Sequence, residues 1–168
     1  MKLLALTAIA TFLIDQASKL IVVHWLNLIE RGSIDVAPPF LVFRMAWNRG
    51  VNFGLFANSA DLMRWGLIAV ALAISVWVVV WIWREGANPR AQISAGLLVG
   101  GALGNVIDRI VYGAVADFLN MSCCGIENPY VFNVADIAIF VGALGIVVFT
   151  GATEKSREKA GPKPRKPR

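Results

Sequence analysis

Two aspartates, Asp117 in Val-Ala-Asp-Phe and Asp136 in Phe-Asn-Val-Ala-Asp, stand at the edges of apolar stretches. An ionised carboxylate near hydrocarbon is costly, so we expect both acids to have a chemical role. Two carboxylates brought together in a site of low dielectric constant share a proton. One then acts as a base on a water molecule while the other protonates a scissile carbonyl. This is the chemistry of an aspartic peptidase.

Asn133 and Asp136 also allow a simpler interpretation. They share one face at the start of an apolar run, where Asn is a common helix N-cap and an acid complements the helix dipole. Asp117, in a predicted loop upstream on the same side, favours the acid pair instead. Other hydrolytic routes lack support, because the chain has one histidine, His24, and no HExxH, GxSxG or Cys-His pattern. We expect no metal.

Two further groups of polar residues lie inside apolar runs. Helical spacing puts Asn105, Asp108 and Arg109 on one face. Two alternatives stay open for Arg109. It forms a structural ion pair with Asp108, or it contacts the substrate directly. Asn105 suits binding of a peptide or lipid carbonyl. Asp15 and Lys19, at i and i+4, are expected to form a structural pair.

The elements that must position these residues are membrane helices. The chain has 168 residues, of which 57% are hydrophobic and 16% charged, so a membrane bundle is expected. A helix of roughly 20 apolar residues spans a hydrocarbon core of about 30 Å. Four windows meet this condition: 3–23, 64–83, 91–112 and 133–151.

Basic residues predict how the bundle is oriented. Lys2, Arg84, Arg90 and the seven lysines and arginines after Gly151 fall on one side of the predicted membrane, so both termini should be cytoplasmic. Residues 1–153 then form the membrane domain. The basic, proline-rich tail 154–168 is predicted to be disordered and able to touch anionic membrane lipids. Topology explains the positive charge, so we expect no nucleic-acid partner.

The segment of about residues 25–63 is too polar to span the membrane. The stretch 40–47 is rich in strand formers, 48–50 is a turn signal and 51–56 is apolar again, which predicts a hairpin on the outer surface. Its role is either that of a structured loop or that of a platform for an extended peptide. Cys123 and Cys124 lie in a later outer loop, and we expect unpaired thiols there because a disulfide between neighbours is strained.

Five motifs occur in order along the chain, and over nearly its whole length the chain resembles bacterial lipoprotein signal peptidase, that is, signal peptidase II. The motifs are Asp15-Gln-Ala-Ser-Lys19, Asn48-Arg-Gly50 with Phe53, the stretch Gly100 to Arg109, Val115-Ala-Asp117-Phe118 and Phe132-Asn133-Val-Ala135-Asp136. The resemblance implies four transmembrane helices with a small extracytoplasmic β-cradle between the first two.

The resemblance further implies an aspartic endopeptidase of the bacterial inner membrane, with its active site near the outer leaflet. It would cut prolipoproteins just before their diacylglyceryl-cysteine, need no cofactor and be blocked by globomycin. Asp117 and Asp136 would form the catalytic dyad. The residues implied to bind substrate or orient the dyad are Asn48, Gly50, Asn105, Arg109 and Asn133. One departure is Asn52, where the family usually has Ala, which affects the expected fit near the hairpin.

A small ion- or proton-coupled transporter is the best alternative from another class, because membrane carboxylates also serve as proton relays. The chain lacks the inverted repeat that many such transporters show, and its acids gather toward one membrane face instead of the midplane. The peptidase is therefore the favoured function.

Overall fold

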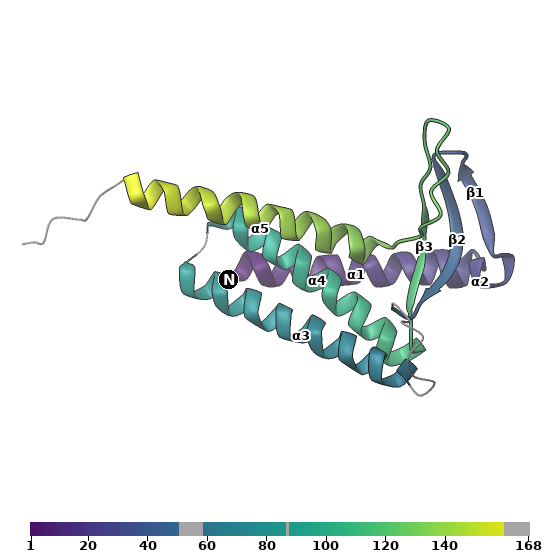
Figure 1. The fold of residues 1–168 in the computed structure, drawn as a ribbon, viewed down its shortest axis with the longest axis horizontal. Helices are drawn as coiled ribbons and strands as arrows, with labels where there is room; N and C mark the ends of the chain where they lie inside the picture. Colours follow the sequence, from purple (N-terminus) through teal and green to yellow (C-terminus); the bar gives the residue numbers. More distant parts are fainter. Residues whose placement is uncertain (51–58, 87, 160–168) are drawn as a thin grey trace, which may run out of the picture.

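The computed structural model describes residues 1–50, 59–86 and 88–159. The elements in chain order are α1 (Lys2–Lys19), a π-helical continuation η1 (Leu20–Trp25), α2 (Leu28–Arg31), β1 (Ser33–Ala37), β2 (Leu41–Asn48), α3 (Ser59–Glu85), α4 (Pro89–Tyr112), β3 (Val115–Asn120) and α5 (Val134–Lys159). The helices lie roughly along one direction, and the strands cross one end of the bundle (Figure 1).

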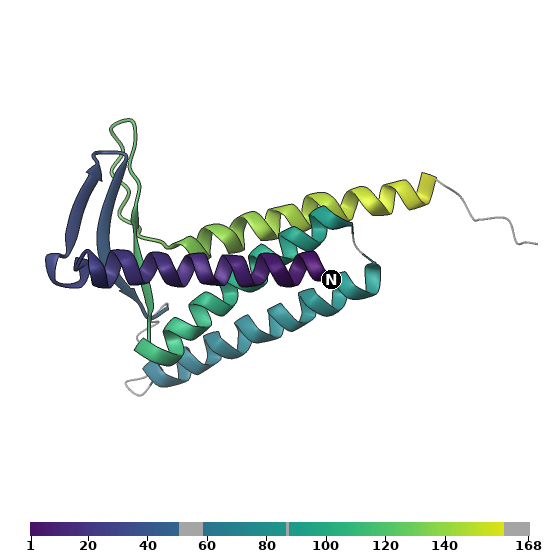
Figure 2. The same cartoon turned by 180° about the vertical axis from the view of Figure 1, so that it is seen from behind.

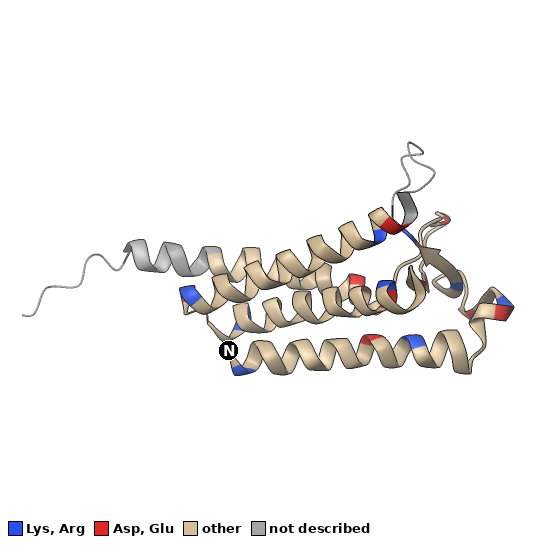
Figure 3. Cartoon of the chain, turned by 90° about the horizontal axis from the view of Figure 1, so that it is seen from below, with Lys and Arg blue, Asp and Glu red and all other residues tan. Residues whose placement is uncertain are grey.

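The helices have the composition of membrane spans. Among the described residues, three stretches are long and apolar enough to cross a bilayer, Lys2–Trp25, Asp61–Glu85 and Pro89–Tyr112, while Val134–Thr150 is a shorter apolar helix. Charged residues are sparse along the middle of the bundle (Figure 3). Large apolar side chains such as Leu6, Trp77 and Phe140 are exposed on its outside, as lipid contact requires. Three predicted spans are supported, and the fourth stays a prediction.

Helix α4 is the centre of the bundle, and its small residues explain why. A Cβ added at Gly96 or Gly100 would collide with backbone atoms of α1. One added at Gly101 would lie 2.5 Å from the carbonyl oxygen of Ala135 on α5. The glycines therefore let two helices approach α4 closely on different faces, as small residues do in membrane bundles. Helix α1 passes behind α4 in Figure 1 and in front of it in Figure 2.

The strands form one antiparallel sheet in the order β1-β2-β3. The predicted strand 40–47 is present as β2. The partner of β2 in the hairpin is the preceding strand β1, and its other edge pairs with β3, with Ala46 opposite Asp117. The expected second arm, 51–56, lies outside the described residues, as do Asn52 and Phe53.

The loop between β3 and α5 is closed at its base. Leu119 and Phe132 exchange two backbone hydrogen bonds of 2.8 and 3.0 Å. The side-chain amide of Asn120 donates to the carbonyl oxygens of Asn128 and Tyr130 at 2.7 and 2.8 Å. These bonds fix the end of β3 relative to the beginning of α5.

Outside the core, the structure describes the two cysteines and the start of the predicted tail. Cys123 and Cys124 form a disulfide, so the expectation of unpaired thiols is wrong. The two residues lie in a tight turn, closed by a bridge between Cys123 and Ile126, in which Cys124 has a φ of 59°. Helix α5 continues to Lys159 and so includes the first residues of the predicted tail. Residues 160–168 lie outside the described part, and the domain division at residue 153 stays a prediction.

Candidate active site

Asp117 is held by a strand and not, as expected, by a loop. Ala116 and Phe118 pack into an apolar cluster with Val22 and Val23 of η1. Successive side chains of a strand point to opposite faces, so Asp117 faces away from this cluster. Strand β3 is almost entirely buried. A strand buried on both faces lacks the alternation that reveals a strand in sequence, which explains the wrong expectation.

Asp136 lies in the first turn of α5 and is fixed there by a reciprocal cap. The Asn133 Oδ1 atom accepts a hydrogen bond of 2.9 Å from the backbone N–H of Asp136. The Asp136 Oδ2 atom accepts one of 3.2 Å from the backbone N–H of Asn133. This is the geometry of a capping box. The simpler interpretation of these two residues, a helix N-cap and an acid in the first turn, is thus confirmed.

The same cap determines what the rest of the Asn133 side chain does. Because Oδ1 is occupied by the cap, the Nδ2 group is left to donate. It donates to Asp117 Oδ1 at 2.6 Å and to Asn105 Oδ1 at 3.3 Å. Asn133 therefore connects the two acids that the sequence analysis expects to meet, and its side chain is fully buried.

Asn48 holds the other oxygen of Asp117. The backbone N–H of Gly50 donates to Asn48 Oδ1 at 3.0 Å, which leaves the Nδ2 group to donate to Asp117 Oδ2, also at 3.0 Å. Gly50 has a φ of 87°, and a Cβ there would lie 2.7 Å from Leu67 Cδ1 of α3. Gly50 thus acts through Asn48 and is not among the hydrogen-bond partners of either carboxylate.

Helix α4 supplies the remaining amide and a guanidinium. Asn105 Nδ2 donates to Asp136 Oδ1 at 2.9 Å. Arg109, one turn further, donates from Nη1 to the carbonyl oxygen of Asn105 at 3.1 Å. Three asparagines from β2, α4 and the start of α5 therefore donate to the two carboxylates, and Arg109 lies beside them.

Burial raises the pKa of Asp117 to about 6, and the negative charge of Asp136 acts in the same direction. Hydrogen bonds from Asn48 and Asn133 and the positive charge of Lys19 oppose this rise. Asp117 is only 2% exposed. A carboxyl group with this pKa exchanges a proton near neutral pH, which suits a general acid or base.

Asp15, Lys19 and Asp108 form a separate buried ionic group. Lys19 Nζ lies 2.7 Å from Asp15 Oδ2, which confirms the expected pair, and 2.8 Å from Asp108 Oδ2. Of the two alternatives left open for Asp108 and Arg109, the ion pair is not seen among the described residues, because Asp108 pairs with Lys19 of another helix. Gln16, which sequence reasoning left without a role, donates to Asp108 Oδ1 at 3.1 Å. Its only signal was its place inside the first of the five motifs.

The chemistry open to this site is proton transfer. Two carboxylates surrounded by amide donors can hold one shared proton and move it between a water molecule and a carbonyl group. Within the described part of the chain, no group of three or more His, Cys, Asp or Glu side chains is placed to hold a metal ion.

Comparisons with known proteins show to which family the chain belongs. The model of the signal peptidase (SPase) II family matches residues 7–151. The chain is 46% identical over 140 residues to the lipoprotein signal peptidase of Methylorubrum extorquens (strain PA1), with 83% of this chain and 80% of the relative covered. It is 41% identical over 154 residues to that of Methylobacterium sp. (strain 4-46), with 92% of each covered.

A solved structure of a bacterial membrane enzyme, obtained by the in meso method at 2.3 Å resolution, has the same fold. Its TM-score is 0.74 at 27% identity, with 99% of this chain and 96% of that chain covered. The apolar helices and the family match together imply a multi-pass membrane protein. From the family model and the curated relatives, the chain belongs to the signal peptidase II family, the lipoprotein signal peptidases.

Proposed function

We propose that the chain is an aspartic endopeptidase that cleaves signal peptides from prolipoproteins just before a diacylglyceryl-modified cysteine. Asp117 and Asp136 are its catalytic dyad. The observation that carries this proposal is the Asn133 amide, which donates to Asp117 while its own cap fixes Asp136. Such a connection brings two acids together at the end of the bundle, where a substrate held in the outer leaflet would present its cleavage site.

The mechanism follows from the shared proton. The ionised carboxylate takes a proton from water as the water oxygen bonds to the scissile carbonyl carbon, and the protonated acid donates to the carbonyl oxygen. The acid that took the water proton then gives it to the leaving nitrogen as the peptide bond breaks, and the other carboxylate takes back a hydroxyl proton from the tetrahedral intermediate. Neither acid is consumed, because the pair ends with one proton as it began.

The amides have two roles in this proposal. Asn48, Asn105 and Asn133 hold the carboxylates in place through the hydrogen bonds described above, and Gly50 orients Asn48. Arg109, beside the dyad, binds the substrate backbone or the charge that develops on its carbonyl oxygen, since a guanidinium offers several donors in a fixed plane.

The location of the enzyme is part of the proposal. Membership of the signal peptidase II family favours a bacterial inner membrane. The basic residues favour an orientation with both termini in the cytoplasm, which puts the sheet and the dyad at the outer leaflet. Membrane lipids then surround the bundle. The transporter alternative is not proposed, because the chain belongs to a peptidase family.

The test is turnover of a diacylglyceryl-modified preprotein by detergent-solubilised protein. We expect Asp117→Asn and Asp136→Asn each to lose at least about 10² to 10⁴ in rate, because Asn cannot exchange the proton. The double variant should lose little more, since members of one catalytic unit are not additive. Globomycin should inhibit the wild-type protein, and the unlipidated preprotein should stay intact.

A matched control is Asp35→Asn, the same change at an exposed residue of β1. It should leave turnover unchanged. A well-folded Asp117→Asn or Asp136→Asn protein that cleaves as fast as Asp35→Asn would remove that aspartate from the mechanism.

A further inference from the structure

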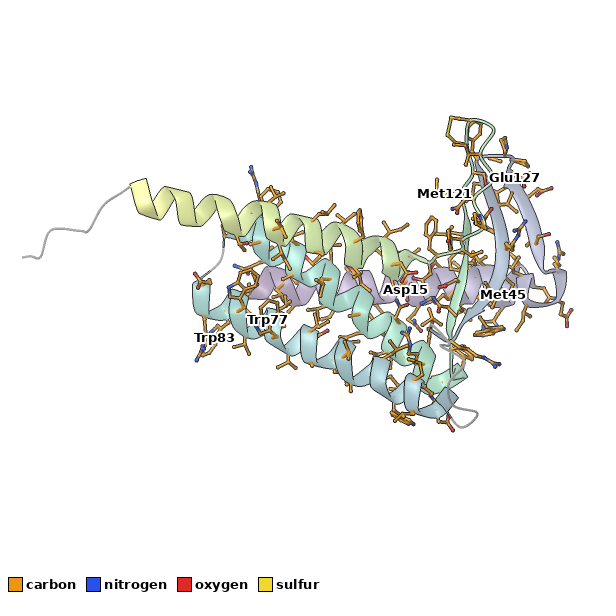
Figure 4. The ribbon with its side chains drawn as sticks, in the orientation of Figure 1. Asp15, Met45, Trp77, Trp83, Met121 and Glu127 are labelled. Atoms are coloured by element: carbon orange, nitrogen blue, oxygen red, sulfur yellow. A yellow bond between two sulfur atoms is a disulfide. The ribbon has the colours of Figure 1, made fainter. Side chains whose placement is uncertain are left out.

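The buried ionic group of Asp15, Lys19 and Asp108 lies next to the dyad but shares no residue with it. The side chains of both acids are 0% exposed and that of Lys19 is 7% exposed. Removing three charges from solvent is expensive, and a bundle held only by packing would not need them. In Figure 4 the labelled Asp15 lies where α1, α4 and the start of α5 meet, beside the sheet. The group therefore lies where β3 and the start of α5, which carry the two acids of the dyad, join the bundle.

Asp108 binds the backbone next to the first catalytic acid. Its Oδ2 atom accepts a hydrogen bond of 3.2 Å from the backbone N–H of Ala116, the residue before Asp117. The side chain of Ala116 packs in the apolar cluster with η1, so this peptide is held from two sides. A shift of Asp108 would move the start of β3, and with it the carboxylate of Asp117.

Asp15 does the same for the second acid. Its Oδ1 atom accepts a hydrogen bond of 2.9 Å from the backbone N–H of Ala135, the residue before Asp136. This N–H belongs to the first turn of α5, where backbone donors have no partner within the helix and the dipole favours a negative charge. Asp15 therefore anchors the end of α5 that carries Asp136.

Lys19 connects the two anchors. Its ammonium group contacts one oxygen of each acid, Asp15 Oδ2 and Asp108 Oδ2, at 2.7 and 2.8 Å. We propose that Asp15, Lys19 and Asp108 are positioning residues that set the separation of the two catalytic carboxylates by holding the peptides that precede them. This inference rests on the proposed dyad. It assigns a positioning function to three residues that their ion pairs alone would mark as structural.

Space for this arrangement is provided by a glycine. A Cβ added at Gly104 of α4 would lie 2.5 Å from Asp15 Oδ2 and 3.2 Å from Asp15 Cγ. Any side chain at this position would therefore displace the carboxylate that holds Ala135. The close approach of α1 to α4 at Gly104 serves the ionic group as well as helix packing.

The test compares two substitutions of Asp108 that remove the same charge. Asp108→Asn keeps an oxygen that can accept from Ala116 N–H and Lys19, because the amide of Gln16 can turn to face the new Nδ2 group. Asp108→Leu keeps the size but has no acceptor. We expect Asp108→Leu to lower kcat at least about tenfold with KM within about twofold, since small misplacements of catalytic groups are costly. Asp108→Asn should retain most of the wild-type kcat.

The matched control is Arg64→Gln. Arg64 also bonds the end of α4, donating to the carbonyl oxygen of Ile110 at 2.8 Å, but it does not bond the peptide of Ala116 or Ala135. We expect this variant to have a lower melting temperature and an unchanged kcat. If it loses as much kcat as Asp108→Leu, or if both Asp108 variants keep the wild-type kcat, the positioning role is refuted.

The same comparison at Asp15 covers the case in which Asp108→Leu does not fold. Asp15→Asn retains an acceptor for Ala135 N–H and Asp15→Leu does not, so the Asn variant should again keep the higher kcat. Asp117→Asn is assayed alongside. If it is inactive while the Leu variants are fully active, the positioning role fails and the dyad stands; if it is fully active, both proposals fail.

Discussion

Replacing Asn133 by serine and by alanine separates its two contacts. Serine supplies an N-cap oxygen about as well as asparagine, but its side chain is too short to reproduce the 2.6 Å bond to Asp117. Alanine loses both contacts. A hydrogen bond to a charged group contributes about 1.5 to 3 kcal/mol. If that contribution holds the reactive geometry, both variants should lose about 10- to 150-fold in kcat.

Stability should distinguish the two variants. Loss of the cap costs about 1 kcal/mol, so Asn133→Ala should unfold at a lower temperature while Asn133→Ser stays close to the wild type. The assays are turnover of a diacylglyceryl-modified preprotein and thermal unfolding in detergent. A wild-type kcat in Asn133→Ser would refute the argument that Asn133 organises the acid pair, and equal melting temperatures in both variants would refute the capping role.

Three other measurements test separate parts of the site. Because the pKa of Asp117 is raised to about 6, the pair keeps its shared proton below that pH and loses it above, so kcat/KM should fall as pH rises through about 6; a profile that stays flat from about pH 5 to 8 would contradict this. Gly104→Ala should cost roughly 1 to 3 kcal/mol of stability through collision with Asp15, while Gly66→Ala, in open space on α3, should be neutral or stabilising; equal melting temperatures would refute the close approach. Arg109→Lys should stay folded and cleave at least about tenfold more slowly, a barrier increase of roughly 1.4 kcal/mol, and normal turnover would reduce Arg109 to a supporting charge.

Local patterns in the sequence predicted the parts of this fold that depend on local interactions. Long apolar runs marked the helices, because a membrane helix satisfies its hydrogen bonds within one segment. The strand 40–47 was predicted from its strand-forming residues and appears as Leu41–Asn48. The spacing of Asn133 and Asp136 indicated a cap, and the cap is present.

Contacts between distant segments could not be predicted in the same way. The sequence leaves an ion pair between Asp108 and its neighbour Arg109 open, but the partner of Asp108 is Lys19 of α1, which is distant in the chain. The sequence predicts a partner for β2 in the segment that follows it, whereas its neighbour β3 in the sheet lies beyond two helices in the chain. Asn48 and Asp117 are far apart in the sequence, and only the tertiary structure brings them into contact.

The closed base of the loop after β3 has a consequence for how this chain can change. The bonds between Leu119 and Phe132, together with those from Asn120 to Asn128 and Tyr130, hold the strand and the helix that carry the two acids. We therefore expect that residues 121–127 can be lengthened, shortened or exchanged without altering the distance across the dyad. Natural variation in length should collect there, and a tag or reporter peptide spliced into this loop should leave catalysis intact.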